Sequence, residues 1–124
     1  MLSIIHKKDY QDFLKLLERW QTVVADPDCD PQKIENQELW QNLQTVFKDR
    51  IITITDTDMN LADASSWISI QAEIQREFRL LQTDWLFFQS SRQVTTRQAR
   101  QANMLKHLEK LIIYCQSLLA EDAN

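Results

Sequence analysis

The chain has 124 residues, 44% of them hydrophobic, a formal net charge of -4 and no glycine. This length and apolar content predict one folded domain with a single core. Glycine supplies positive φ angles and close backbone approach to phosphates, so its absence argues against P-loop, dinucleotide-binding and nucleophile-elbow proteins. The acidic balance gives no overall attraction to nucleic acid or to anionic membranes.

The first expected element is a helix over residues 3–24. Its apolar residues recur every three or four positions and so share one helical face. They are Tyr10, Phe13, Leu17, Trp20 and Val24. The helix should end near Ala25, because both prolines of the chain lie in the segment 26–31 and each disfavours helix in the residue before it.

A second helix is expected over residues 31–54. Asp30 is suited to an N-cap and Pro31 to the first helical position, where the donor that proline lacks would be unpaired anyway. The apolar stripe is Trp40, Leu43, Phe47, Ile51 and Ile54. The β-branched run 51–55 is also typical of a short strand. We interpret it as a fraying helix end, because the sequence offers no partner strand.

The third helix, over residues 63–92, has the longest apolar stripe. Its members are Trp67, Ile70, Ile74, Phe78, Leu81, Trp85 and Phe88. The segment 56–66 before it is rich in aspartate, asparagine and serine, which is typical of a connection with competing N-caps.

The fourth helix is expected over residues 96–120. Thr95 and Gln98 form a capping-box pattern, in which each side chain bonds the other's backbone N–H. The apolar stripe is Ala102, Leu105, Leu108, Ile112, Cys115 and Leu119. Short links favour antiparallel neighbours, so the sequence predicts an all-α, four-helix antiparallel bundle. The alternative fuses the second and third helices into one long bent helix, whose three-helix core is completed in a homodimer.

Few residues are suited to catalysis or metal binding. The histidines and cysteines show no metal-ligand spacing: they are His6, His107, Cys29 and Cys115. Glu73 and Glu77 are interpreted as a solvated face, His107 as an exposed side chain and Cys115 as a buried one. We therefore expect no enzyme activity, no metal and no cofactor, and the pattern assigns no role to Cys29.

The location indicated by the sequence is the cytoplasm. Two cysteines far apart in the chain are typical of reduced thiols, since a core of this size does not require a disulfide. The first eight residues are too short in apolar content for a signal core, and no segment approaches the ~20 apolar residues of a membrane span. We expect no membrane association.

Charge is unevenly distributed along the chain. Nine acids and three basic residues lie between Asp26 and Asp63, whereas no acid lies between Trp85 and Leu108. Arg92, Arg97 and Arg100 fall in this second region, the latter two in the first turns of a helix, where the dipole disfavours cations. They either keep a solvent face soluble and pair with acids of another helix, or form a docking site for an acidic partner. Nucleic-acid binding is the less favoured third interpretation.

Four consecutive apolar residues, 85–88, end the third helix. One stripe buries Trp85 and Phe88 but turns Leu86 or Phe87 outward. Burial between two neighbouring helices would explain the run. A surface for a partner or for self-association is the alternative, and it makes Phe87 a candidate binding residue together with the three arginines.

The C-terminal third to half of the chain resembles the small cyanobacterial PatD family. The similar stretches are 78–89 (FRLLQTDWLFFQ), 91–93 (SRQ), 96–97 (TR) and 111–119 (LIIYCQSLL). That family is associated with control of heterocyst frequency and with binding the division protein FtsZ. The resemblance implies a non-enzymatic regulatory adaptor that works by protein binding. The alternative class is a small helical regulator associated with nucleic acid.

Overall fold

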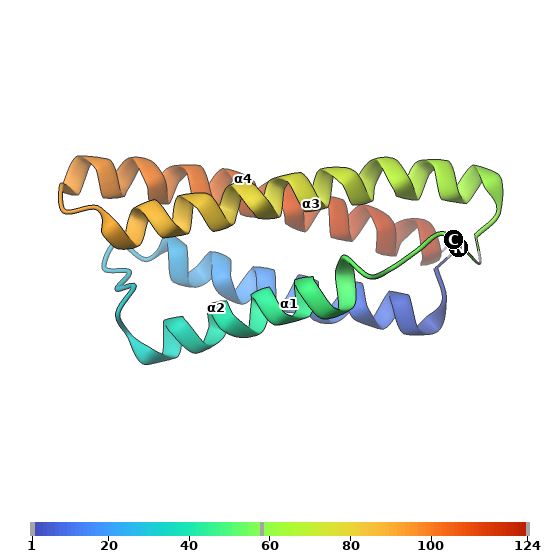
Figure 1. Cartoon of the computed structure of the whole chain (residues 1–124), viewed down its shortest axis with the longest axis horizontal. Helices are drawn as coiled ribbons and strands as arrows, with labels where there is room; N and C mark the ends of the chain where they lie inside the picture. The colour runs from blue at the N-terminus through green and yellow to red at the C-terminus, as the bar shows by residue number, and fades with distance from the viewer. Residues whose placement is uncertain (1, 58, 124) are drawn as a thin grey trace.

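Four α-helices run up and down in the computed structural model, which describes residues 2–57 and 59–123. They are α1 (Ile4–Ala25), α2 (Ile34–Val46), α3 (Leu61–Ser90) and α4 (Val94–Ala123). A π-helical turn, η1 (Phe47–Ile51), continues α2. Figure 1 shows successive helices antiparallel, with the α1–α2 and α3–α4 connections at one end of the bundle, here called the loop end. The predicted antiparallel four-helix bundle is confirmed. The alternative prediction, in which the second and third helices form one long helix, is wrong.

Only three of the four pairs of neighbouring helices pack with their backbones close together. Helix α1 packs against α2 and α4, and α4 packs against α3, but no Cα atom of α2 or η1 lies within 8 Å of one in α3. Aromatic side chains span this fourth side: the ring of Phe47 stacks on Phe78 with centroids 4.0 Å apart, and Trp40 lies 5.9 Å from both Phe78 and Trp85. The α2–α3 seam is therefore joined by side chains over a wide backbone gap.

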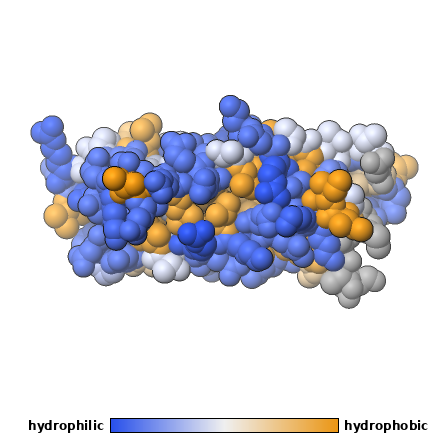
Figure 2. Space-filling view, turned by 90° about the horizontal axis from the view of Figure 1, so that it is seen from below, coloured by the Kyte–Doolittle hydropathy of each residue, from blue (hydrophilic) through white to orange (hydrophobic). Residues whose placement is uncertain are grey.

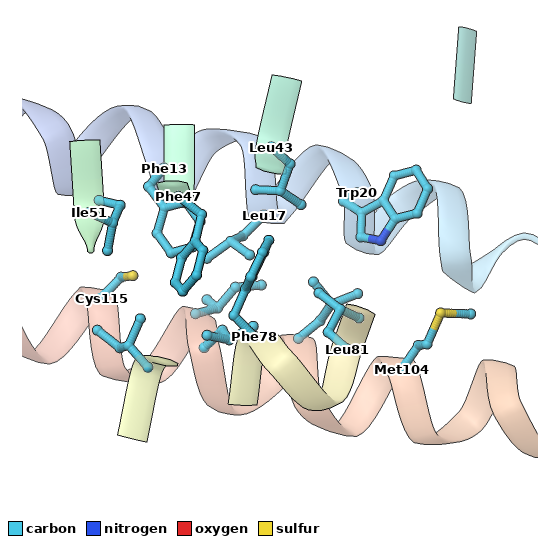
Figure 3. Packing of buried hydrophobic residues seen from close by; sticks show 14 of the residues in the cluster. Phe13, Leu17, Trp20, Leu43, Phe47, Ile51, Phe78, Leu81, Met104 and Cys115 are labelled. Carbon is cyan, nitrogen blue, oxygen red and sulfur yellow. The ribbon is translucent and has the colours of Figure 1, made fainter. Parts of the chain in front are cut away.

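The core follows the apolar stripes of the helices (Figure 3). All five stripe residues predicted for α1 are 0% exposed, and the stripe predicted for α2 and its extension is buried throughout. In α3, Gln71 takes the core position predicted for Ile70, which is only partly buried. The α4 stripe is rotated from the predicted one: Ala102 is exposed, and, besides Ile112, which is buried as predicted, the buried positions alternate steps of four and three, the spacing of helices packed side by side. These positions are Met104, Leu108, Leu111, Cys115 and Leu118.

A buried hydrogen-bond network fixes the π turn to the core. Gln71 Nε2 donates to the Ile51 carbonyl at 2.8 Å, while the Tyr10 hydroxyl donates to Gln71 Oε1 at 2.7 Å. Trp67 Nε1 in turn donates to the Tyr10 oxygen at 2.8 Å. Burial raises the pKa of Tyr10, so the hydroxyl stays protonated. A glutamine is thus tolerated in an apolar stripe because its amide oxygen and nitrogen are both bonded.

The start of α2 differs from the prediction. Asp30 does not cap the helix: its carboxylate accepts the N–H of Gln32 at 2.9 Å, and its carbonyl accepts the N–H of Lys33 at 3.2 Å. These bonds form a turn that contains Pro31, and the helix begins after it at Ile34.

The end of this element also differs. The Ile52 N–H donates to the Phe47 carbonyl at 2.9 Å, which makes the last turn π-helical and ends it at Ile51 rather than at 54. Residues 52 and 53 form a turn after it, and no strand occurs among the described residues.

The other boundaries lie within two residues of those predicted, except that α4 ends at Ala123, three residues beyond the predicted end. Ser3 and Asn60 cap α1 and α3, with their side-chain oxygens accepting the N–H groups of His6 and Asp63. Helix α4 begins at Val94 because the Arg97 N–H bonds the Gln93 carbonyl at 3.0 Å. Thr95 and Gln98 therefore lie inside the first turn, and the predicted capping box is wrong.

Most of the surface seen from below in Figure 2 is hydrophilic. Hydrophobic side chains appear there as separate patches between polar ones. Scattered exposed apolar residues are normal for a folded domain, so a binding surface must be argued from particular residues.

Candidate functional site

The predicted site residues lie at the loop end, where α3 ends and α4 begins. Trp85 and Phe88 are buried at 2% exposure, whereas Phe87 is 46% exposed and Leu86 is 64% exposed. The prediction that the whole run 85–88 is buried between two helices is therefore wrong. Successive residues of a helix point about 100° apart, so one run cannot face the core throughout. Val94, at the start of α4, is 66% exposed. The loop end thus presents three large apolar side chains.

Arg100 holds Phe87 in place. Its guanidinium lies 4.6 Å from the centroid of the Phe87 ring, and one terminal nitrogen lies 2.9 Å from the Asp84 carboxylate. Such a stack is a cation–π interaction, and the acid fixes the orientation of the planar group. Arg100 is therefore engaged within the chain, as the first of the sequence interpretations supposed.

Arg97 is also engaged. Its guanidinium lies 4.9 Å from the centroid of the Phe88 ring, and its Nε atom is buried without a hydrogen-bond partner. It borders a hollow of about 380 Å³ whose other wall is the acidic α1–α2 connection, including Asp28 and Asp30. The fold thus brings the acidic and basic regions of the chain together at the loop end. Arg92 alone of the three arginines is exposed and makes no ion pair with a described residue.

Cys29 lies in the wall of the same hollow and is 7% exposed. Burial, with a smaller effect from Asp26, raises the pKa of its thiol to about 11. The buried Cys115, which was predicted in the core, has its pKa raised by burial to about 12. Both thiols are protonated at neutral pH, which disfavours a nucleophilic role because the thiolate is the reactive form.

A charged cluster that sequence reasoning missed extends from Arg100 along the α3–α4 seam. Glu77 is 1% exposed, and its carboxylate lies 2.5 Å from Nδ1 of His107. The other ring nitrogen of His107 lies 3.2 Å from Asp84. The predictions that Glu77 lies on a solvated face and that His107 is exposed are both wrong. Arg76 pairs with both Glu73 and Glu77, at 3.5 and 3.2 Å.

Seven-residue spacing is the sequence signal for this cluster. Glu77 and Asp84 are seven apart on α3, and so are Arg100 and His107 on α4. In antiparallel helices packed side by side, positions with this spacing flank the core and face each other in pairs. The apolar stripes alone did not reveal which flank would be covered.

The cluster is built to compensate buried charge. Both ring nitrogens of His107 face a carboxylate, Nδ1 that of Glu77 and Nε2 that of Asp84. Glu77 is further contacted by Arg76 at 3.2 Å and Lys110 at 3.7 Å. Since each acid has basic partners, the arrangement favours a structural role for these residues.

The chain matches no protein-family model, and comparisons with curated proteins and with solved structures also found no match. The resemblance to the PatD family therefore stays a prediction. Any functional proposal depends on that resemblance and on the residues themselves.

Two further observations concern possible classes of function. Among the described residues, no group of three or more histidines, cysteines and acids is placed to hold a metal ion. Within the same part of the chain, no helix has the length and apolar content to cross a membrane.

Proposed function

We propose that the protein is a cytoplasmic, non-enzymatic regulatory adaptor that binds another protein through the loop end. The binding surface comprises Leu86, Phe87, Arg92 and Val94, hereafter the loop-end patch. The observation that carries this proposal is the exposure, at one end of the bundle, of three large apolar side chains and of an arginine that makes no ion pair with a described residue.

The chemistry of the patch is typical of a protein interface. Aromatic and arginine side chains dominate the binding energy of many interfaces, and an aromatic anchor costs less on binding when it is already ordered. Arg100 orders Phe87 in this way, since its guanidinium stacks on the ring while Asp84 holds the other side. Arg92, in the connection that follows α3, would favour an acidic partner.

The partner proposed is FtsZ, as the resemblance to the PatD family implies. Through it the protein would modulate cell division and heterocyst differentiation. The structure gives less support to nucleic-acid binding, because Arg100 is paired with Asp84 and Arg97 lies beside the acidic α1–α2 connection. Phosphate binding at these positions would require breaking or opposing those interactions.

The test is a titration of purified FtsZ onto the immobilised chain, repeated with Phe87→Ser and with Arg92→Glu. Each substitution should weaken binding at least about tenfold, which corresponds to ~1.4 kcal/mol. Ile113→Ser and Lys106→Glu are the controls: both residues are exposed on α4, away from the loop end, and should leave affinity unchanged.

Absence of binding by the unaltered chain would reject FtsZ as the partner. Native binding that persists in both loop-end variants would reject the patch. A DNA-shift assay at two salt concentrations checks the alternative, because binding through phosphate contacts weakens steeply as salt rises.

A further inference from the structure

A groove on the described part of the molecule follows the α2–α3 seam. It comprises two adjoining hollows, of about 600 Å³ and 390 Å³, which share Gln41 as a lining residue. Trp40 and Trp85 lie at the floor of the first and Phe47 at the floor of the second. In Figure 1, α2 and α3 border this side of the bundle, and no Cα atom of one lies within 8 Å of a Cα atom of the other. The backbone gap described above is therefore a groove in the surface.

Amide side chains form both rims of the groove. They are Gln37, Gln41, Asn42 and Gln44 on the α2 side, and Gln82 and Gln89 on the α3 side. An amide both donates and accepts hydrogen bonds, so a rim of this kind is complementary to another copy of itself. A rim of like charges would not be.

The charged residues lining the groove are separated by sign. Glu38 lines the hollow nearer the loop end, whereas Lys48 and Arg79 line the other. All three are exposed, and none makes an ion pair with another described residue. Glu38 and Lys48 are ten positions apart, or about 15 Å along a helix, too far to pair within one chain.

Exposed apolar residues lie toward the two ends of the groove. Ile34 lines the first hollow and is 69% exposed, while Ile52 lines the second and is 40% exposed. Along the groove, each half thus has one isoleucine and one sign of charge, with amides between them.

We propose that this groove binds a second copy of the chain in a two-fold symmetric dimer. A two-fold axis through the middle of the groove brings the acidic half of one copy over the basic half of the other. Glu38 then faces Lys48 and Arg79 of the second copy, the isoleucines meet at both ends, and the glutamines meet near the axis. Every contact occurs twice.

This pattern favours a second copy over an unrelated partner. An acidic segment would be attracted by Lys48 and Arg79 but repelled by Glu38, and a basic segment would meet the opposite problem. Only a partner with the same charges in reverse order is complementary at both ends, and two-fold symmetry supplies it. The proposal does not depend on the loop-end patch, because Phe87 lies on the α4 side of α3, against Arg100.

The test is analytical ultracentrifugation of the full chain over a range of concentrations. The unaltered chain should show a concentration-dependent dimer. Glu38→Lys places like charges opposite one another twice in each dimer, and so does the pair Lys48→Glu and Arg79→Glu. Each should weaken dimerisation by roughly tenfold or more. Glu109→Lys, an exposed exchange on α4 outside the groove, is the matched control and should have no effect.

Recombining the exchanges distinguishes charge pairing from damage to the fold. The triple variant, Glu38→Lys with Lys48→Glu and Arg79→Glu, restores opposite charges across the axis and should dimerise as the unaltered chain does. A mixture of the two weakened variants should form heterodimers. A chain that stays monomeric at millimolar concentration, a dimer indifferent to Glu38→Lys, or a triple variant that is not rescued would each overturn the proposal.

Discussion

The carboxylate of Glu77 is buried at 1% exposure and lies 2.5 Å from the imidazole of His107 on the facing helix. A buried acid of this kind is costly unless it is paired and hydrogen-bonded. His107 therefore offsets the cost of burying Glu77, and it does the same for Asp84 on its other side. The α3–α4 contact combines apolar packing with an ionic cluster.

Glu77 and His107 should be energetically coupled, so that their contributions to stability are not additive. We expect His107→Leu to lower the free energy of unfolding by about 2 kcal/mol, since a hydrogen bond to a buried charge is lost while Arg76 and Lys110 still contact the acid. The double variant, Glu77→Leu with His107→Leu, should cost less than the sum of the single ones. Urea unfolding in a double-mutant cycle measures this coupling. Additive effects would show that the two side chains do not interact.

Gln71 should be more important for stability than the exposed glutamines of the bundle. Gln71→Leu leaves the Ile51 carbonyl without its side-chain donor and the Tyr10 hydroxyl without its acceptor, so a loss of about 1–3 kcal/mol is expected. Gln116, which is exposed on α4, is the control, and Gln116→Leu should change stability by less than ~0.5 kcal/mol. Equal effects in thermal or urea unfolding would contradict the network.

Phe78 lies at the centre of the aromatic core. It is 0% exposed and its ring centroid lies 4.0 Å from that of Phe47 and 5.8 Å from that of Phe13. Phe78→Ala should therefore lower the unfolding free energy by about 3–5 kcal/mol, from lost burial and the cavity left behind. Phe87→Ala, at the half-exposed site on the same helix, should cost much less. Comparable losses would mean that Phe78 is not the packing centre.

The ion pair between Arg50 and Asp12 should make stability depend on pH. The hydrogen bond from Arg50, at 2.7 Å, lowers the pKa of Asp12 in the folded chain. The unfolded chain therefore binds this proton more readily, so the stabilisation is present above about pH 4 and is lost as pH falls from there through the lower folded pKa.

The matching measurement compares the unaltered chain with Arg50→Met from pH 7 down to pH 2. The difference in unfolding free energy should shrink toward low pH, because Asp12 is then neutral in both folded chains. Arg19, which is exposed on α1, provides the control: Arg19→Met should show no such trend. A difference that stays constant with pH would remove Asp12 as the cause.

The helices and most of the core were predictable because burial on one face repeats along a helix. The stripe residues are buried as the spacing predicts. They are Tyr10, Phe13, Leu17, Trp20 and Val24 on α1, and Phe47, Ile51 and Ile54 after α2. Helix starts were less predictable, since the same aspartate side chain can cap a helix or close a turn. Asp30 closes a turn, which moves the start of α2 to Ile34.

The candidate site was only partly predictable. The outward orientation of Phe87 follows from helical geometry, but the partners of Arg97 and Arg100 come from other segments of the chain. The α1–α2 connection lies beside Arg97 in the fold, but the two are far apart in the sequence, so no local pattern predicts their contact. His107 was misjudged for the same reason: an α4 stripe centred on Ala102 and Leu105 turns it toward solvent, whereas the actual stripe turns it toward Glu77.

The pairing of His107 with Glu77 and of Arg100 with Asp84 also selects one alignment of α3 and α4. Apolar stripes with a seven-residue repeat would pack almost as well if one helix slid by seven positions. A slide in one direction would place Glu77 opposite Arg100 and Asp84 opposite Gln93. The reverse slide would place Glu77 opposite Tyr114. Either displacement leaves a carboxylate facing a neutral side chain, so the ionic cluster discriminates against misaligned packings that hydrophobicity alone would accept.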